Sequence, residues 1–241
     1  MLHRTQGIVL HSFRYGETSI IARVFTRDLG LQSYLIPGVR KTRATVRQNL
    51  FQPLTLVDLV VYHKERGGLQ RIKEISCPDI YQQIPYDIMK SSIAIFLSEM
   101  LTKSLKERDP NPGMFDYISQ ALRFLDQTKG RVVDFHLVFL LHLSRFLGFQ
   151  PRNNYDAHHR YFNLKEGFFQ KLCSDGDDCL NLELSHFFHQ LNMVELNQLE
   201  DLHISGPERR SLLQKTIDYY RWHLDGLQEV RSHFVLEMVL N

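Results

Sequence analysis

The chain has 241 residues, 43% of them hydrophobic and 23% charged, which are ordinary proportions for a soluble globular protein. No apolar run approaches the roughly 20 residues that span a bilayer, and three cysteines are too few for a disulfide framework. We therefore expect a cytoplasmic protein with a small domain and a larger one. The net charge of +2 is unevenly spread, because residues 1–75 hold twelve Lys and Arg against five Asp and Glu, whereas the remainder holds 17 against 22.

The first part of the chain is rich in β-forming residues separated by short turns that contain glycine. Strands are predicted at residues 7–13, 19–26, 31–36, 54–62 and 69–75, with a short helix within 46–51. Five strands with short turns predict a small closed barrel of the OB-fold type, which we place in residues 1–78. The pattern of the last strand puts Gln70 outward, with Arg71 or Lys73 as further outward candidates. A barrel whose charged face is merely solvated is the alternative interpretation.

A cationic segment follows the third predicted strand. The turn Pro37-Gly38 precedes Arg40, Lys41 and Arg43, and no acidic residue occurs between Leu29 and Val57. Clustered cations without nearby carboxylates repel one another, so this segment favours contact with a polyanion such as a nucleic-acid backbone.

The candidate DNA contacts are cations of the first domain, each expected to touch phosphate rather than bases. The first set is Arg14, Arg23, Arg27, Arg40, Lys41, Arg43 and Arg47, and the second is Lys64, Arg66, Arg71 and Lys73. Tyr15 and Tyr34 are candidate platforms on which unpaired bases stack. Phe13 is a weaker candidate, and we expect it in the barrel core.

Residues 79–241 carry mainly helical periodicity and predict an all-α bundle, so the whole chain is of the α+β class. Helices are expected at 85–105, 114–126, 132–147, 184–191, 207–227 and 232–240, with a breaker at 109–113. The helix at 132–147 is apolar on most sides and should be central. Residues 149–181 break the period and predict an irregular arm with a short hairpin within 160–169.

Several segments, in this order and at these spacings, resemble the bacterial RecO family of DNA repair and recombination mediators. They are Gly7-Ile8-Val9-Leu10, Tyr15-Gly16-Glu17-Thr18-Ser19, Pro37-Gly38-Val39-Arg40-Lys41, Pro53-Leu54, Gly67-Gly68-Leu69 and, more loosely, Leu147-Gly148-Phe149. The resemblance covers essentially the whole chain and is strongest over the first 70 residues.

The resemblance implies a non-enzymatic protein of the RecF pathway, with an OB-fold followed by a helical domain. Such proteins bind single- and double-stranded DNA, anneal complementary strands, and with RecR help RecA replace single-strand binding protein. It implies a nucleoid-associated location and a site for the tail of single-strand binding protein, for which Arg123, Lys129 and Arg131 are candidates. An OB-fold adaptor that binds RNA or a protein is the alternative.

One departure from the family concerns zinc. Many RecO proteins carry two Cys-x-x-Cys pairs after the Leu-Gly-Phe segment, whereas residues 153–159 here contain no cysteine. The remaining possible ligands are Asp156, His158, His159, Cys173 and Cys179, which lack the close pairing that structural zinc sites favour. We therefore expect no cofactor, and an arm held by packing of its aromatic side chains. No catalytic motif is present in the sequence.

Overall fold

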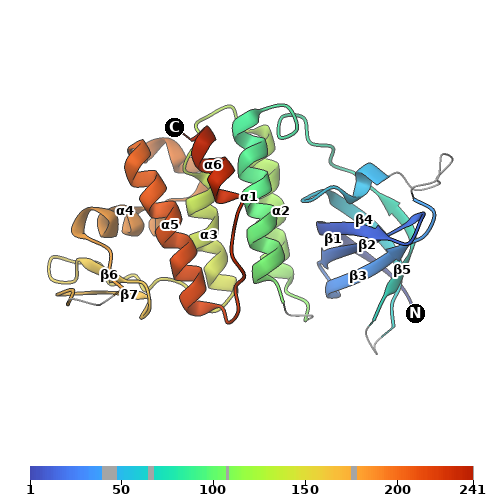
Figure 1. Ribbon diagram of the computed structural model, residues 1–241, viewed down its shortest axis with the longest axis horizontal. Coiled ribbons are helices and arrows are strands. Elements are labelled where there is room, and N and C mark those ends of the chain that lie inside the picture. Colours follow the sequence, from blue (N-terminus) through green and yellow to red (C-terminus); the bar gives the residue numbers. More distant parts are fainter. Residues whose placement is uncertain (40–47, 65–67, 107–108, 175–177, 241) are drawn as a thin grey trace. The chain divides into compact units, whose positions relative to one another are not determined.

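The computed structural model describes residues 1–39, 48–64, 68–106, 109–174 and 178–240 (Figure 1). The chain forms two compact units. The first comprises Met1–Pro85 and Leu97–Arg123, and the second comprises Tyr86–Phe96 and Phe124–Asn241. The domain boundary expected at residue 78 stays a prediction. None of the described helices is long and apolar enough to cross a membrane.

Five strands of the first unit close into a barrel (Figure 1). They are β1 (Leu2–Tyr15), β2 (Ser19–Thr26), β3 (Gly30–Ile36), β4 (Leu56–Tyr62) and β5 (Gln70–Ser76). The order is β1-β2-β3-β5-β4, β1 also pairs with β4, and only the β3–β5 pairing is parallel. This is the five-stranded barrel that the sequence predicted.

The barrel encloses an apolar core contributed by every strand. Val9, Val24 and Leu59 belong to it, and Phe51 from the short 3-10 helix η1 (Gln48–Phe51) is also fully buried there. The carbonyl oxygen of Phe51 accepts a hydrogen bond from the Ser12 hydroxyl at 2.9 Å, which joins η1 to β1. The predicted short helix is thus present as a 3-10 turn over the described residues.

A β-bulge at Leu10 changes which residues of β1 face outward. Val9 pairs with Val24, whereas His11 pairs with Arg23, so Leu10 is the extra residue. Its carbonyl oxygen accepts hydrogen bonds from the hydroxyls of Ser98 and Thr102 at 3.3 and 3.4 Å. Odd-numbered residues face the core before the bulge and the outside after it.

Two predictions about side-chain direction are wrong, and the bulge at Leu10 accounts for the first of them. Phe13 follows the bulge in β1 and is 44% exposed instead of lying in the core. Gln70 is buried instead of outward, because its carboxamide bonds both the N–H and the carbonyl of Lys64, at 3.0 and 3.1 Å. A second register shift lies between β4 and β5. Ile72 pairs with Val61 and Glu74 pairs with the adjacent Val60, so Lys73 is an extra residue.

The second unit is organised around α3 (Phe135–Phe146), as the sequence predicted. This helix packs against several other elements, and nine of its twelve residues are buried. The remaining elements are α1 (Ile88–Ser104), α2 (Pro112–Gln127), β6 (Tyr161–Asn163), β7 (Phe168–Gln170), α4 (Leu182–Met193), η2 (Leu196–Asp201), α5 (Gly206–His223) and α6 (His233–Val239). Helices α1 and α2 contribute residues to both units, and β6 and β7 form the expected hairpin.

A glycine in β1 is required by close packing inside the barrel wall. A Cβ at Gly7 would lie 2.6 Å from Val24 Cγ1 and 3.0 Å from Leu59 Cδ1. Gly7→Ala is therefore expected to lower the free energy of unfolding by about 1–3 kcal/mol through overpacking, measured by urea denaturation. Gly130→Ala is the control, because the one atom closer than 3.0 Å to its new Cβ is Glu200 Oε1, the end of a flexible exposed side chain. Equal effects of the two changes would contradict the prediction.

Candidate nucleic-acid interface

Two rows of outward-facing side chains cross the barrel wall. In the first row, His11 of β1 pairs with Arg23 of β2. The second row consists of Phe13, Ile21, Leu35, Arg71 and Tyr62 on five successive strands. Because directly paired residues place their side chains on one face of a sheet, His11 lies beside Arg23 and Tyr62 lies beside Arg71, whereas Phe13 lies beside the buried Ile21. We define the outer barrel face by its exposed and half-exposed aromatic and basic side chains, which are His11, Phe13, Tyr15, Arg23, Tyr62 and Arg71.

The aromatic members are unusually accessible for rings on a strand. Phe13, Tyr15 and Tyr62 expose 44%, 51% and 50% of their surface. The ring of His11 stacks on Phe13 with centroids 5.8 Å apart and planes inclined by 26°. Exposed rings in a basic surface are the arrangement on which unpaired bases stack without regard to sequence.

The basic members supply charge close to these rings. Arg71 is exposed and Arg23 is half-buried, and within the described ranges no carboxylate forms an ion pair with either. Unpaired guanidinium groups can accept a phosphate without first losing a protein partner. Arg14 lies near the end of β1 and is exposed as well.

The other predicted cations are placed differently. Lys64 is exposed at the end of β4, and the Lys73 ammonium lies 3.3 Å from the Glu74 carboxylate. Five predicted contacts lie outside the described residues: Arg40, Lys41, Arg43, Arg47 and Arg66. The contact of the cationic segment after Pro37-Gly38 with a nucleic-acid backbone therefore stays a prediction.

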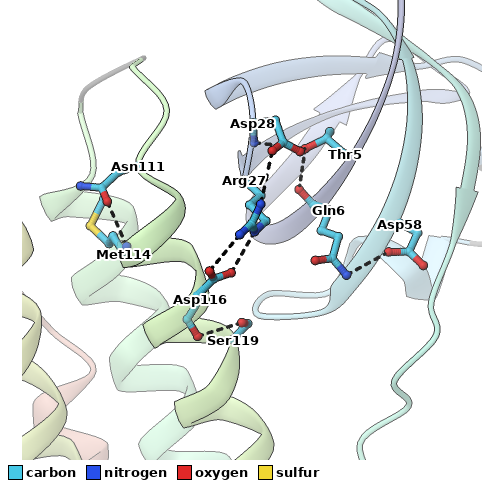
Figure 2. Close-up of polar contacts among 9 residues, drawn as sticks. All are labelled: Thr5, Gln6, Arg27, Asp28, Asp58, Asn111, Met114, Asp116 and Ser119. Atoms are coloured by element: carbon cyan, nitrogen blue, oxygen red, sulfur yellow. Dashed lines mark hydrogen bonds and ion pairs between the residues drawn. The ribbon is translucent and has the colours of Figure 1, made fainter.

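Arg27 is held by carboxylates (Figure 2). Its Nε and terminal nitrogen donate to the two oxygens of Asp116 at 2.9 and 3.0 Å, and Asp28 lies 3.6 Å away. This hydrogen-bonded contact lowers the pKa of Asp116 below its usual value. The adjoining hollow of about 620 Å³ is lined by Asp58 and Glu74 as well, so phosphate would meet several carboxylates there. The arrangement does not support the predicted phosphate contact of Arg27.

The prediction that Tyr34 is a stacking platform is wrong. Its side chain is fully buried in the barrel core, and burial raises the pKa of its hydroxyl. A ring enclosed by Val9 and other core residues cannot receive a base. Tyr15, the other predicted platform, is accessible.

The three cations predicted to bind a partner's tail have separate surroundings. Arg123 belongs to the first unit and pairs with Asp79 at 2.8 Å. Arg131 belongs to the second unit and pairs with Asp134 at 3.3 Å, whereas Lys129 is exposed. Both arginines would have to leave a carboxylate to bind an acidic peptide.

The possible zinc ligands do not form a common site. Asp156 bonds to His159, and Cys173 is exposed. Cys179 lies beside Asn163 of β6 in an isolated bridge. Across the part of the chain that the structure describes, no three side chains of the His, Cys, Asp and Glu types gather as metal ligands would.

Two members of the outer barrel face, His11 and Tyr62, are not predicted by the sequence. His11 becomes outward only because of the bulge at Leu10, for which the sequence carries no visible signal. Tyr62 ends an apolar strand, where an aromatic residue is equally common in a core. Its signal is the polar residues that follow, His63 and Lys64.

Both halves of the chain are similar to known proteins. Two family models match, Recombination protein O N terminal over residues 1–81 and Recombination protein O C terminal over residues 85–232. The chain is 32% identical over 239 residues to the DNA repair protein RecO of Flavobacterium psychrophilum, with 99% of each chain covered. It is 35% identical over 242 residues to the DNA repair protein RecO of Bacteroides fragilis, with 98% of each covered. These matches confirm the predicted resemblance, and the chain belongs to the RecO family of DNA repair proteins.

Proposed function

We propose that the chain is a recombination mediator that binds single-stranded DNA on the outer barrel face. In this role it anneals complementary strands and, with RecR, helps to load RecA onto DNA coated by single-strand binding protein. It also binds double-stranded DNA and acts without catalysing a reaction of its own. The observation that carries the proposal is the set of exposed rings and guanidinium groups on the outer barrel face, where His11 pairs with Arg23 and Tyr62 pairs with Arg71.

The chemistry of this face suits an unpaired strand better than a duplex. A base can stack on Phe13 or Tyr62 only when it is not already stacked and paired, and each such stack stabilises binding by about 1–3 kcal/mol. Arg23 and Arg71 add phosphate contacts that carry no sequence information. A mediator has to act on any gap, so binding without sequence preference is what the role requires.

The first test removes the rings. Phe13→Ala and Tyr62→Ala are each expected to weaken binding of a fluorescently labelled oligothymidine about 5- to 150-fold, since each loses one stacked base. Fluorescence anisotropy at constant salt measures the change. Leu2→Ala truncates an exposed apolar side chain that is in register with Tyr62 but has no ring, and it should change affinity little. Equal losses in all three variants would contradict the proposal.

The second test removes the charges and reads the salt dependence. Arg23→Ala and Arg71→Ala are each expected to reduce the slope of log K against log salt by about 0.7, the value for one phosphate on a single strand. Arg4→Ala is the matched control, because Arg4 is likewise an arginine on a barrel strand, β1, but lines the hollow with Asp28 and Asp58. A barrel that binds RNA instead would show the same slopes with RNA and a clear preference for it over DNA.

The mediator role is tested separately from binding. Complementary strands coated with single-strand binding protein should anneal faster when the chain is added, and RecR should change this rate. Lys129→Glu tests the exposed cation of the second unit, and it should weaken capture of the acidic tail without altering binding to bare DNA. DNA binding that survives without any effect on coated strands would limit the role to that of an adaptor. A focal distribution over the nucleoid in cells is expected.

A further inference from the structure

The arm, residues 149–181, lies between α3 and α4 in the second unit, where zinc-binding relatives would place their cysteines. Its possible ligands are already used in local contacts. Asp156 Oδ1 accepts the backbone N–H groups of His158 and His159, both at 2.7 Å, and contacts His159 Nδ1 at 3.0 Å. The hydrogen bond from His159 and these two N–H groups lower the pKa of Asp156 to about 2. The carboxylate therefore stabilises a turn of its own segment.

The thiols are similarly unsuited to a shared ion. Cys179 Sγ accepts a hydrogen bond from Gln170 Nε2 at 3.1 Å, next to the bridge between Asn163 and Cys179. Cys173 is exposed and bonds to the carbonyl oxygen of Ser174. This donor set does not fit a tetrahedral zinc site, which needs four converging ligands.

We propose that the arm is fixed without a metal, by the carboxamide of Asn154 and the ring of Tyr155. Both residues stand in the segment that carries the first cysteine pair in zinc-binding relatives. They connect this segment to β7 and to α4 respectively, which is the kind of cross-link that a structural metal provides. The proposal concerns folding and does not depend on DNA binding.

Asn154 closes the outer edge of β7. Its Nδ2 donates to the carbonyl oxygen of Phe169 at 2.7 Å, and its Oδ1 accepts the N–H of Phe169 at 2.9 Å. One side chain thus makes both bonds that a neighbouring strand would make to this residue. The backbone bonds Arg152 N–H to Gly167 O at 2.8 Å and Arg160 N–H to Gln170 O at 3.1 Å lie on either side.

Tyr155 ties the same segment to α4. Its ring stacks on His189 with centroids 4.6 Å apart and planes inclined by 17°, and it meets Phe169 edge-on at 5.1 Å. Its hydroxyl lies 3.3 Å from His186 Nδ1. The hairpin beneath is itself packed, since the Phe162 ring stacks on Phe188 of α4 at 4.3 Å.

Metal content gives the first test. The full chain, expressed in medium supplemented with zinc and purified without chelator, is expected to contain no stoichiometric zinc by mass spectrometry. Its thermal midpoint should be the same before and after treatment with EDTA. One zinc per chain, together with a lower midpoint after the zinc is removed, would overturn the proposal.

Paired asparagine variants give the second test. Asn154→Ala leaves two backbone groups of Phe169 without their partners and is expected to lower the thermal midpoint by roughly 5–10 °C. Asn153→Ala is the control, because Asn153 is the same residue type one position away and is exposed. Tyr155→Leu should also lower the midpoint, whereas Cys173→Ser should not. Equal midpoints for Asn154→Ala and Asn153→Ala would refute the role of the carboxamide.

A third measurement covers the case in which Asn154→Ala fails to fold. Hydrogen exchange of the unaltered chain should then show the Phe169 N–H protected to the same degree as amides inside the β6–β7 ladder. Exchange at the rate of an unstructured peptide would overturn the proposal, because the N–H would then have no stable acceptor in solution.

Discussion

Arg209→Ala is expected to lower the free energy of unfolding of the second unit by about 3–5 kcal/mol, as for other buried ion pairs that lose one partner. Arg209 Nε donates to Asp134 Oδ1 at 2.6 Å, and the side chains are 6% and 0% exposed. A second guanidinium nitrogen donates to the carbonyl oxygen of Ile204 at 2.7 Å. The variant therefore leaves a fully buried carboxylate short of its main partner and a carbonyl without its donor. Urea denaturation followed by circular dichroism measures the loss.

Two further variants separate charge burial from simple loss of contacts. Arg131 also pairs with Asp134, but at 3.3 Å and with 39% of its side chain exposed, so Arg131→Ala should cost no more than about 1 kcal/mol. Replacing both partners, Arg209→Met with Asp134→Leu, should cost far less than either single change because no buried charge is left unpaired. Comparable losses for Arg209→Ala and Arg131→Ala would show that the buried pair is not important for stability.

The pairing of Arg209 with Asp134 could not be predicted from the sequence. Arg209 and Asp134 are 75 residues apart, and neither stands in a motif that would relate them. The helices that carry them are predictable, because the capping residues Ser205 and Glu208 at the start of α5 form a local pattern. Local patterns specify elements, whereas partners across a core depend on how the elements pack.

Some local patterns are also open to two interpretations. Residues 109–113 predict a breaker, yet α2 begins at Pro112. The Asn111 side chain accepts the N–H of Met114 at 3.0 Å, which caps the helix, and proline suits the first helical position. The residues that predict a breaker therefore include the cap and the first residue of the next helix.

The candidate interface was predictable in kind but not in detail. The charge count predicts that the barrel meets a polyanion, which stays a prediction, and the predicted cations Arg23 and Arg71 lie on the outer barrel face. Strand alternation could not tell which rings face outward, because the bulge at Leu10 reverses the alternation and exposes Phe13. Nor could it show that Arg27 would be taken by Asp116, which is 89 residues away.

Acid is expected to destabilise the second unit through His136. This residue lies in α3 and is fully buried, and within the described residues neither ring nitrogen has a hydrogen-bond partner. Burial, together with the nearby charge of Arg209, lowers the pKa of His136 to about 3 from the usual 6.5. The ring is therefore neutral in the folded chain at any pH at which the protein is handled. Its edge-to-face contact with Phe96, at 5.9 Å, is that of an apolar core residue.

The direction of the pH dependence follows from proton counting. Between pH 6.5 and about 3 the unfolded chain binds a proton at His136 that the folded chain does not, so the free energy of unfolding falls as the pH falls. The contribution is fully present above pH 6.5, and its loss reaches at most roughly 5 kcal/mol near pH 3. Burial also lowers the pKa of His142 and His189, which adds to the loss in the same direction.

His136→Leu isolates this contribution, because it removes the titrating group and fills the site with an apolar side chain. The variant is expected to equal or exceed the unaltered chain in stability at pH 7, since two unpartnered ring nitrogens leave the core. Its free energy of unfolding should decline less steeply between pH 6.5 and 4, measured by urea denaturation at each pH. His203→Leu, the same change at an exposed position, should leave the slope unaltered. Parallel slopes for His136→Leu and the unaltered chain would mean that His136 gains a proton, or a partner, in the folded state in solution.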